Sequence, residues 1–219
     1  MPHVYVLRHH PSALHKAQRA LASMPGWTLA GAGTHGRLAA EDIVRTRPDI
    51  LACDLRLADG PATRLESALR GMDEPPLVLL FADSPDELGM FDALRSIGNG
   101  YAVEGGRTQG LIGALRRLAS GRASMSPQLA QQTLALAALG RTRLADAQLP
   151  AAARDYGQAG GLLGFTRADQ HLLSLLAHGL LVGEVAARWR VGEVEIERRI
   201  HALYQRLHGS ARAAAQAAA

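Results

Sequence analysis

Charged side chains follow several short apolar segments of this sequence, at positions where they could meet. Arg8 and His9 lie at the end of the first segment, Asp54 at the end of the third, and Glu104 at the end of the fifth. Side chains at the carboxyl ends of neighbouring parallel strands share one edge of a sheet, where ligands bind. A guanidinium such as that of Arg8 pairs well with a carboxylate such as that of Asp54. The residues therefore allow a cation–carboxylate pair at this edge, or an Arg8 side chain that points to solvent.

A glycine-rich segment offers a different chemistry. GAGTHG (31–36) has the G-x-G-x-x-G spacing of a dinucleotide-binding loop, and Asp54 stands at the end of the next apolar segment. The motif lies in the second apolar–amphipathic repeat rather than the first, and no substrate domain or acid–base set follows it. A dinucleotide-binding oxidoreductase is therefore a remote alternative.

Histidine and cysteine chemistry has less support. His9, His10 and His15 have no carboxylate placed beside them, and adjacent histidines seldom bind one ion together, so we expect no metal and no cofactor. Cys53 is the only cysteine, which excludes an internal disulfide, and its apolar surroundings predict a core residue. Because no nucleophile motif is present either, we do not expect an enzyme.

Five repeats of a short apolar segment and an amphipathic segment must position these residues. The predicted strands are 3–8, 27–33, 49–55, 76–82 and 100–105, and the predicted helices are 12–24, 36–46, 61–71, 85–97 and 108–120. The nearly continuous apolar runs at 51–53 and 77–81 are typical of parallel strands buried on both faces. The pattern predicts a doubly wound α/β domain with a five-stranded parallel sheet over residues 1–121.

The remainder of the chain has only helical patterns. Residues 122–160 are expected to form a linker with a helix near 126–139. Residues 161–219 are expected to form an all-α domain with helices at 167–178, 181–189 and 191–209, followed by a short helix or a frayed end.

Charge is divided unevenly between these parts. The chain has 24 Lys and Arg against 20 Asp and Glu, with 10 basic and 13 acidic residues in 1–105, 7 and 2 in 106–160, and 7 and 5 in 161–219. The basic second half is suited to a polyanion. No apolar run reaches membrane-helix length and basic residues interrupt the N-terminus, so we expect a cytoplasmic protein with no membrane contact.

Several of these segments match one known family in the family's order. RPDILACDLRLADG (47–60) resembles the strand that carries the phosphorylated Asp of two-component receivers, and NGYAVEGG (99–106) resembles their fifth strand. Residues 165–207, from FTRADQ to YQRL, resemble a LuxR-type helix-turn-helix. The whole chain is thus similar to NarL/FixJ-class response regulators. The resemblance implies a CheY-like receiver with Asp54 at the phosphorylation position, then a DNA-binding domain.

The receiver half departs from that family at its chemical positions. The acidic pair that holds Mg²⁺ is replaced by Arg8 and His9, the Thr or Ser of the fourth strand by Phe81, and the Lys of the fifth strand by Glu104. An Arg cannot ligate a hard cation, and phosphoryl transfer depends on electrostatic stabilisation by such groups. We therefore expect a pseudo-receiver that is not phosphorylated on Asp54.

The resemblance also implies a set of DNA contacts on the third helix of the C-terminal domain. Its base-facing positions would be Glu197, Arg198 and His201, and backbone contacts would come from nearby arginines: Arg188, Arg190, Arg199 and Arg206. These charges could also simply be a solvated helix surface.

These observations predict a DNA-binding transcription regulator that acts as a homodimer on double-stranded DNA. The fourth and fifth receiver helices, or the last helix of the DNA-binding domain, would supply the dimer contact. One alternative is an interaction adaptor that has lost DNA binding, which the acidic run Glu193, Glu195 and Glu197 favours. A second alternative is a regulator switched by a protein or a small ligand at the vacated phosphorylation pocket.

Overall fold

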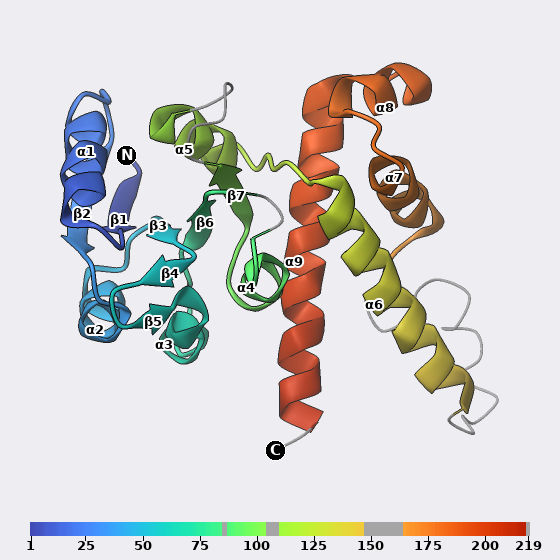
Figure 1. Ribbon diagram of the computed structural model, residues 1–219, viewed down its shortest axis with the longest axis horizontal. Helices are drawn as coiled ribbons and strands as arrows, with labels where there is room; N and C mark the ends of the chain where they lie inside the picture. Colours follow the sequence, from blue (N-terminus) through green and yellow to red (C-terminus); the bar gives the residue numbers. More distant parts are fainter. Residues whose placement is uncertain (85–86, 104–109, 147–163, 218–219) are drawn as a thin grey trace. The chain divides into compact units, whose positions relative to one another are not determined.

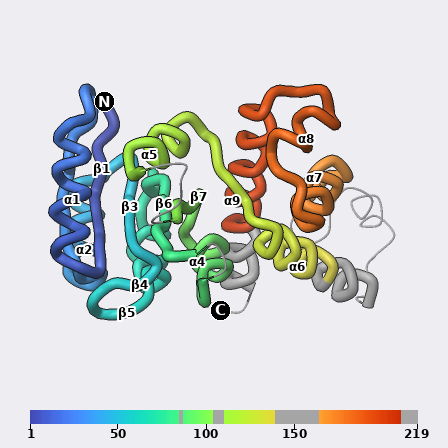
Figure 2. Tube along the Cα trace, turned by 45° about the horizontal axis from the view of Figure 1, so that its top comes forward, coloured from blue at the N-terminus to red at the C-terminus, as the bar shows by residue number. Residues whose placement is uncertain are grey.

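The chain divides into two compact units. The structure is a computed structural model that describes residues 1–84, 87–103, 110–146 and 164–217. The first unit is Met1–Ala123 and the second is Ser124–Ala219. Figures 1 and 2 show a layered α/β arrangement in the first unit and helices alone in the second.

The first unit is built on a five-stranded parallel sheet, as predicted. Its strands lie in the order β2-β1-β3-β6-β7, and their bounds are β1 His3–Leu7, β2 Thr28–Gly33, β3 Ile50–Asp54, β6 Leu77–Ala82 and β7 Gly100–Val103. All four ladders are parallel. The register pairs Asp54 with Phe81, so the end of β3 lies beside the end of β6.

Helices cover both faces of this sheet (Figure 1). On one face, α1 (Pro11–Ala22) and α5 (Leu111–Ala119) bury Leu21 and Leu115 against alternate strand residues such as Val6 and Ala52. The other face carries α2 (Gly36–Thr46), α3 (Glu66–Arg70) and α4 (Met90–Ser96), with the 3₁₀ turn η1 (Ala62–Leu65) before α3. Burial on both faces explains why the central strands are almost continuously apolar.

A two-stranded hairpin after β3 was not foreseen. It consists of β4 (Arg56–Leu57) and β5 (Gly60–Pro61), which pair antiparallel. The carboxylate of Asp59, in its turn, accepts hydrogen bonds from the backbone N–H groups of Gly36 (2.8 Å) and Arg37 (2.9 Å). The hairpin thus caps the N-terminus of α2, which has no cap from its own preceding side chain.

The described part of the second unit consists of α6 (Pro127–Asp146), α7 (Arg167–Ala177), α8 (Val182–Trp189) and α9 (Glu193–Ala217). Helix α6 packs against α7 and extends beyond the predicted end at residue 139. Helix α9 runs without a break through Gly209 to Ala217. Residues 210–217 are therefore helical, as one of the two expected alternatives had it, but they continue α9, and the frayed end is wrong.

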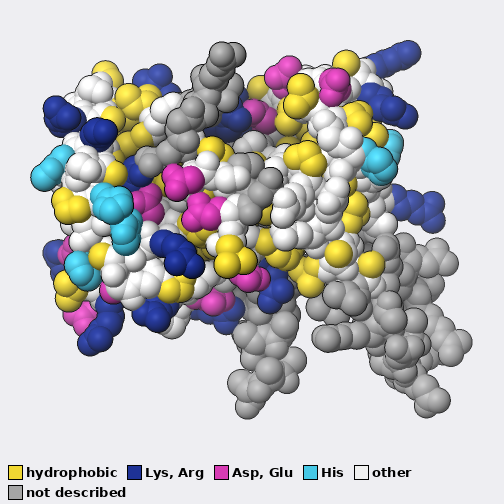
Figure 3. Space-filling model, in the orientation of Figure 1, with side chains coloured by type: hydrophobic (Ala, Val, Ile, Leu, Met, Phe, Trp, Pro, Cys, Tyr) yellow, Lys and Arg dark blue, Asp and Glu magenta, His cyan; other side chains and the backbone are white. Residues whose placement is uncertain are grey.

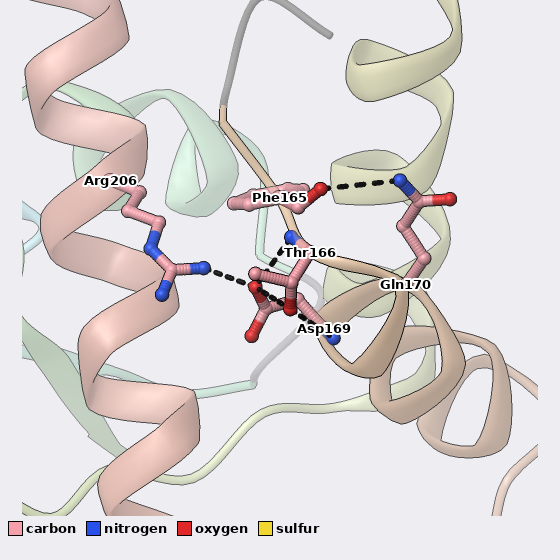
Figure 4. Close-up of polar contacts among 5 residues, drawn as sticks. All are labelled: Phe165, Thr166, Asp169, Gln170 and Arg206. Carbon is pink, nitrogen blue, oxygen red and sulfur yellow. Dashed lines mark hydrogen bonds and ion pairs between the residues drawn. The ribbon is translucent and has the colours of Figure 1, made fainter. Parts of the chain in front are cut away.

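The start of α7 is fixed by a network of polar groups (Figure 4). The Thr166 hydroxyl accepts a hydrogen bond from the Asp169 N–H (3.2 Å), and the Asp169 carboxylate accepts from the Thr166 N–H (2.8 Å) and hydroxyl (2.7 Å). This is a capping box. Arg206 of α9 pairs with the same carboxylate, so the network also joins α7 to α9.

The residues that precede α6 already belong to the second unit. The Tyr204 hydroxyl of α9 donates a hydrogen bond to the backbone oxygen of Ser124 (2.8 Å), and Met125 and Ser126 are buried. Residues 124–126 are therefore attached to the second unit before α6 starts. None of the described helices is long and apolar enough to cross a membrane.

Candidate functional site

The predicted charged edge of the sheet contains a buried ion pair. Arg8 follows β1 directly and Asp54 ends β3, its neighbour in the sheet. The Arg8 Nε atom lies 2.7 Å from Asp54 Oδ1, and the two side chains are only 6% and 16% exposed. The Arg8 side chain therefore does not point to solvent. The other oxygen, Asp54 Oδ2, accepts a hydrogen bond of 2.6 Å from the backbone N–H of His9.

Phe81 of β6 forms the third side of this arrangement. The Arg8 guanidinium carbon lies 4.7 Å from the centre of the Phe81 ring. A buried guanidinium over an aromatic face gains about 2 kcal/mol or more. That attraction offsets part of the cost of removing the Arg8–Asp54 pair from water, which often equals the Coulomb gain. The sequence marks Phe81 only as a substituted position, because its contact with Arg8 depends on the strand register that pairs Phe81 with Asp54.

A pocket of about 360 Å³ opens at the carboxyl ends of these strands. It is lined by residues of four segments, namely His9, His10, Asp54, Leu55, Arg56, Phe81, Ala82, Asp83 and Glu87. The exposed rings of His9 and His10 meet edge to face at 4.4 Å. Within the described ranges, no group of three or more His, Cys, Asp or Glu side chains is arranged to hold a metal ion.

Cys53 and Glu104 are the two remaining residues that the sequence placed near this edge. Cys53 is fully buried in β3, and burial raises the pKa of its thiol well above the usual range, with the Asp54 charge raising it further. The thiol therefore stays protonated and unreactive. Glu104, the remaining member of the predicted pocket, lies outside the described residues.

The glycine-rich segment 31–36 does not leave a free helix terminus. A dinucleotide-binding loop presents the N–H groups of the following helix to a pyrophosphate. Here the first N–H groups of α2, from Gly36 and Arg37, are already bound by the Asp59 carboxylate. A pyrophosphate at this helix would meet the Asp59 charge, which argues against the oxidoreductase alternative.

The predicted DNA contacts of the second unit fall into an exposed set and a buried one. Arg188, Arg190 and Arg198 are exposed, and Glu197 is half-buried on α9. Figure 3 shows Lys and Arg side chains along the outer edge of this unit, beside α7 and α8. His201 is 7% exposed, so its assignment to a base-facing position is wrong in this conformation. It flanks the apolar stripe of α9 and faces the interior.

The two remaining arginines have partners within the unit. Arg199 Nε is 3.0 Å from Glu195 Oε1, and its guanidinium lies 5.6 Å from the centre of the Trp189 ring. Arg206 is held by Asp169. Arg199 remains 40% exposed, so a DNA phosphate could compete with Glu195 for it. Arg206 is better suited to joining α7 and α9.

The turn between α8 and α9 has an unusual backbone. Arg190 adopts a left-handed conformation with φ 55°, at a position where glycine or asparagine is usual. Its N–H bonds to the Ala187 oxygen (3.2 Å), which ends α8. Arg190 thus places an exposed guanidinium in the turn, and its left-handed backbone costs about 1–2 kcal/mol in strain.

Comparisons with known proteins agree with this architecture. No protein-family model matches the chain. A probable transcriptional regulatory protein NarL of Mycobacterium tuberculosis (strain CDC 1551 / Oshkosh) is 25% identical over 210 residues, which cover 96% of this chain and 89% of the relative. The protein of strain ATCC 25618 / H37Rv gives the same values.

Two solved structures share the fold. A LuxR-family two-component response regulator from Aurantimonas sp. SI85-9A1 aligns with a TM-score of 0.52 and 22% identity, over 60% of this chain and 94% of its own. A structure of two RcsB dimers bound to two parallel DNAs aligns with a TM-score of 0.50 and 15% identity, over 96% of this chain and 98% of its own. The receiver fold followed by a helical domain is thus shared over nearly the whole chain.

Proposed function

We propose that this chain, which has the receiver and helix-turn-helix organisation of NarL/LuxR-type response regulators, is a DNA-binding transcription regulator that works without phosphorylation of Asp54. Full-length similarity to a probable transcriptional regulator supports the first part. The proposal assigns the protein a binding function and no catalytic one.

The observation that carries the second part is the Arg8–Asp54 ion pair. A receiver needs Mg²⁺ beside the acceptor carboxylate, and that hard cation takes oxygen ligands. Here a 94% buried guanidinium stands 2.7 Å from Asp54 Oδ1, while the His9 N–H binds Oδ2. A divalent cation would be repelled by the Arg8 charge. Phosphoryl transfer to Asp54 would also have to break the pair, so the receiver stays in one state.

Phosphorylation is tested with acetyl phosphate and Mg²⁺, and the product is read by intact mass. We expect no gain of a phosphoryl group on the wild-type chain. The matched control is Asp54→Ala, which removes the acceptor. A mass gain in the wild type that disappears in Asp54→Ala would refute the phosphorylation-independent part and leave the DNA-binding part standing.

DNA binding is supported by the exposed arginines of α8, the turn and α9. Arg198 lies on the exposed side of α9 and could donate two hydrogen bonds to a guanine edge. An electrophoretic shift with fragments of the source genome tests this. We expect a salt-sensitive shift that Arg198→Ala weakens about tenfold or more, while Arg167→Ala, an exposed arginine at the start of α7, leaves it nearly unchanged.

The adaptor alternative predicts the opposite result. Glu193 and Glu195 lie in the first turn of α9, where the helix dipole stabilises their negative charges. The same charges repel the phosphates of a DNA backbone. A wild-type chain that shows no salt-sensitive shift with any fragment would favour the adaptor. We also infer a homodimer, because a symmetric pair of recognition helices reads two half-sites about one DNA turn apart; sedimentation of the DNA complex measures its stoichiometry.

A ligand-switched regulator is the second candidate, and the pocket beside Asp54 favours it. Its 360 Å³ lies in the size range of small-molecule sites, and its lining combines the apolar Phe81 and Leu55 with charged groups. A small ligand there would touch the ion pair that fixes the receiver. Thermal shift of the full chain against a metabolite library tests this candidate.

A further inference from the structure

The surface formed by α1 and α5 in the first unit carries only positive charge. Both helices cover the same face of the sheet, with Ala17 and Leu118 in one core cluster. Their outward side chains include the exposed Lys16, Arg19 and Arg116. Arg117 and Arg122 lie half-buried beside them. These five residues are called the α1–α5 face. Lys and Arg side chains over α1 are visible at the upper left of Figure 3.

The fold creates this face from two segments far apart in the sequence. Residues 1–40 contain no Asp or Glu, and neither do residues 105–145. All 13 acidic residues of positions 1–105 fall between 41 and 104, in the region that forms α2, α3, α4 and the strands and loops between them. Packing α1 against α5 therefore brings the two acid-free segments together.

The cations gather at one end of the face. Arg19 lies in the last turn of α1, and Arg116 and Arg117 lie in the last turn of α5. Because both helices return antiparallel to parallel strands, their C-termini lie at the same end of the sheet. Cations at helix C-termini are favoured by the helix dipole, which explains each position separately. The dipole does not explain why no acidic residue balances them.

The composition of the face indicates what it binds. Protein–protein interfaces depend on apolar or aromatic anchors at their centre, whereas protein–DNA interfaces are polar and strongly positive. Among the described residues, the large exposed apolar side chains are Met1, Leu29, Leu38, Val44, Leu88, Leu181, Val191 and Val194. None of these belongs to α1 or α5. In the described part of the chain, no ion pair involves Lys16, Arg19 or Arg116.

We propose that the α1–α5 face binds the phosphate backbone of double-stranded DNA without sequence preference. It is a second contact surface, separate from the recognition helix of the second unit. The chain connects the two closely, since α5 ends at Ala119 and α6 begins at Pro127. Exposed cations at this face release counterions when they meet phosphates, so the contact adds to the salt dependence of binding.

The test uses the full chain, a random-sequence DNA duplex and fluorescence polarisation at several salt concentrations. The variant Lys16→Gln/Arg19→Gln/Arg116→Gln removes three charges from the face. The control Arg37→Gln/Arg45→Gln/Arg70→Gln removes three charges from α2 and α3 on the opposite face of the sheet, where Arg45 pairs with Asp42 and Arg70 with Glu66. Circular dichroism checks that both variants fold like the wild type.

We expect the slope of log Kd against log salt to fall by about 2.7 in the face variant, since each lost phosphate contact contributes about 0.9. The loss of affinity between 50 and 200 mM salt then becomes about 40-fold smaller, and the control keeps the wild-type slope. Equal slopes in the face variant and the wild type would overturn the proposal.

A parallel measurement with Arg198→Ala separates this proposal from the function proposed above. If Arg198→Ala weakens binding and the face variant does not, the recognition helix binds DNA and the face does not. If only the face variant weakens binding, the face proposal stands and the recognition helix loses its assigned role. If polyglutamate binds the wild type but not the face variant, while the duplex does not bind, the face accepts acidic protein and the DNA proposal is wrong.

Discussion

Replacing Arg8 with methionine removes the cation beside Asp54 and puts an uncharged, apolar side chain of similar length in its place. Removing one partner of a fully buried pair costs about 3–5 kcal/mol, because the other charge stays in the interior. Asp54 is 16% exposed and keeps the hydrogen bond from the His9 N–H, so part of its charge remains solvated. The Phe81 contact at 4.7 Å is lost as well. We therefore expect Arg8→Met to destabilise the first unit by about 2–4 kcal/mol.

Urea unfolding followed by tryptophan fluorescence measures this change. The chain has two tryptophans, Trp27 in the first unit and Trp189 in the second. A Trp189→Phe background leaves Trp27, which packs against the core below α1, as the reporter of the first unit alone. With a urea slope of about 2 kcal/mol per molar, Arg8→Met lowers the midpoint by about 1–2 M.

A double-mutant cycle isolates the pair itself. Asp54→Asn leaves Arg8 buried without its counter-charge, and the double variant Arg8→Met/Asp54→Asn removes both charges. We expect the double variant to be more stable than the sum of the two single changes by about 1–3 kcal/mol. Arg37→Met, at an exposed position of α2, is the control and should change stability by less than about 0.5 kcal/mol. Additive effects at Arg8 and Asp54 would refute the buried pair.

Three further predictions concern single residues. Desolvation raises the pKa of Asp169, but hydrogen bonds from Thr166 and the Arg206 charge outweigh it and hold this pKa below its usual value. The stability that Asp169 contributes is present above the unfolded-state pKa and is lost as pH falls through the lower folded-state pKa. Asp169→Asn should therefore flatten the acid destabilisation of the second unit, measured by Trp189 fluorescence in a Trp27→Phe background, and cost about 1–3 kcal/mol at neutral pH. Arg190→Gly relieves the left-handed backbone and should stabilise the second unit by about 0.5–1 kcal/mol while weakening DNA binding; a loss of stability in urea would contradict the strain argument. Cys53 should resist thiol reagents in native buffer and react fully in urea, as read by mass; modification without denaturant would show that β3 opens.

The sequence predicts the sheet of the first unit well because its signal is local. Apolar runs at 51–53 and 77–81 mark the central strands, and both are found in β3 and β6. The helix predicted from residue 85 begins instead at Met90, after Gly89 in a left-handed conformation. The hairpin β4–β5 was missed because strands of two residues have no periodicity.

Helix ends in the second unit were less predictable. The helices predicted near 126–139 and at 191–209 both continue past those bounds, through Gly140 in α6 and through Gly209 in α9. A glycine ends a helix only where the chain turns away, and the alanine-rich sequence after Gly209 has high helix propensity. His201 was placed among the base-facing positions by resemblance to the helix-turn-helix family. It lies three residues before Tyr204, at the edge of the apolar stripe, where periodicity alone does not decide its side.

The Tyr204–Ser124 hydrogen bond sets how much chain is left to connect the two units. Since it ties residues 124–126 to the second unit, only residues 120–123 connect α5 to that unit. Four residues span at most about 14 Å. A short tether of this kind gives the second binding event an effective concentration in the millimolar range. If a duplex binds α9 as proposed, it is offered to the proposed α1–α5 face at that effective concentration. Phosphate contacts too weak to hold DNA alone would then still lengthen its residence on the whole protein.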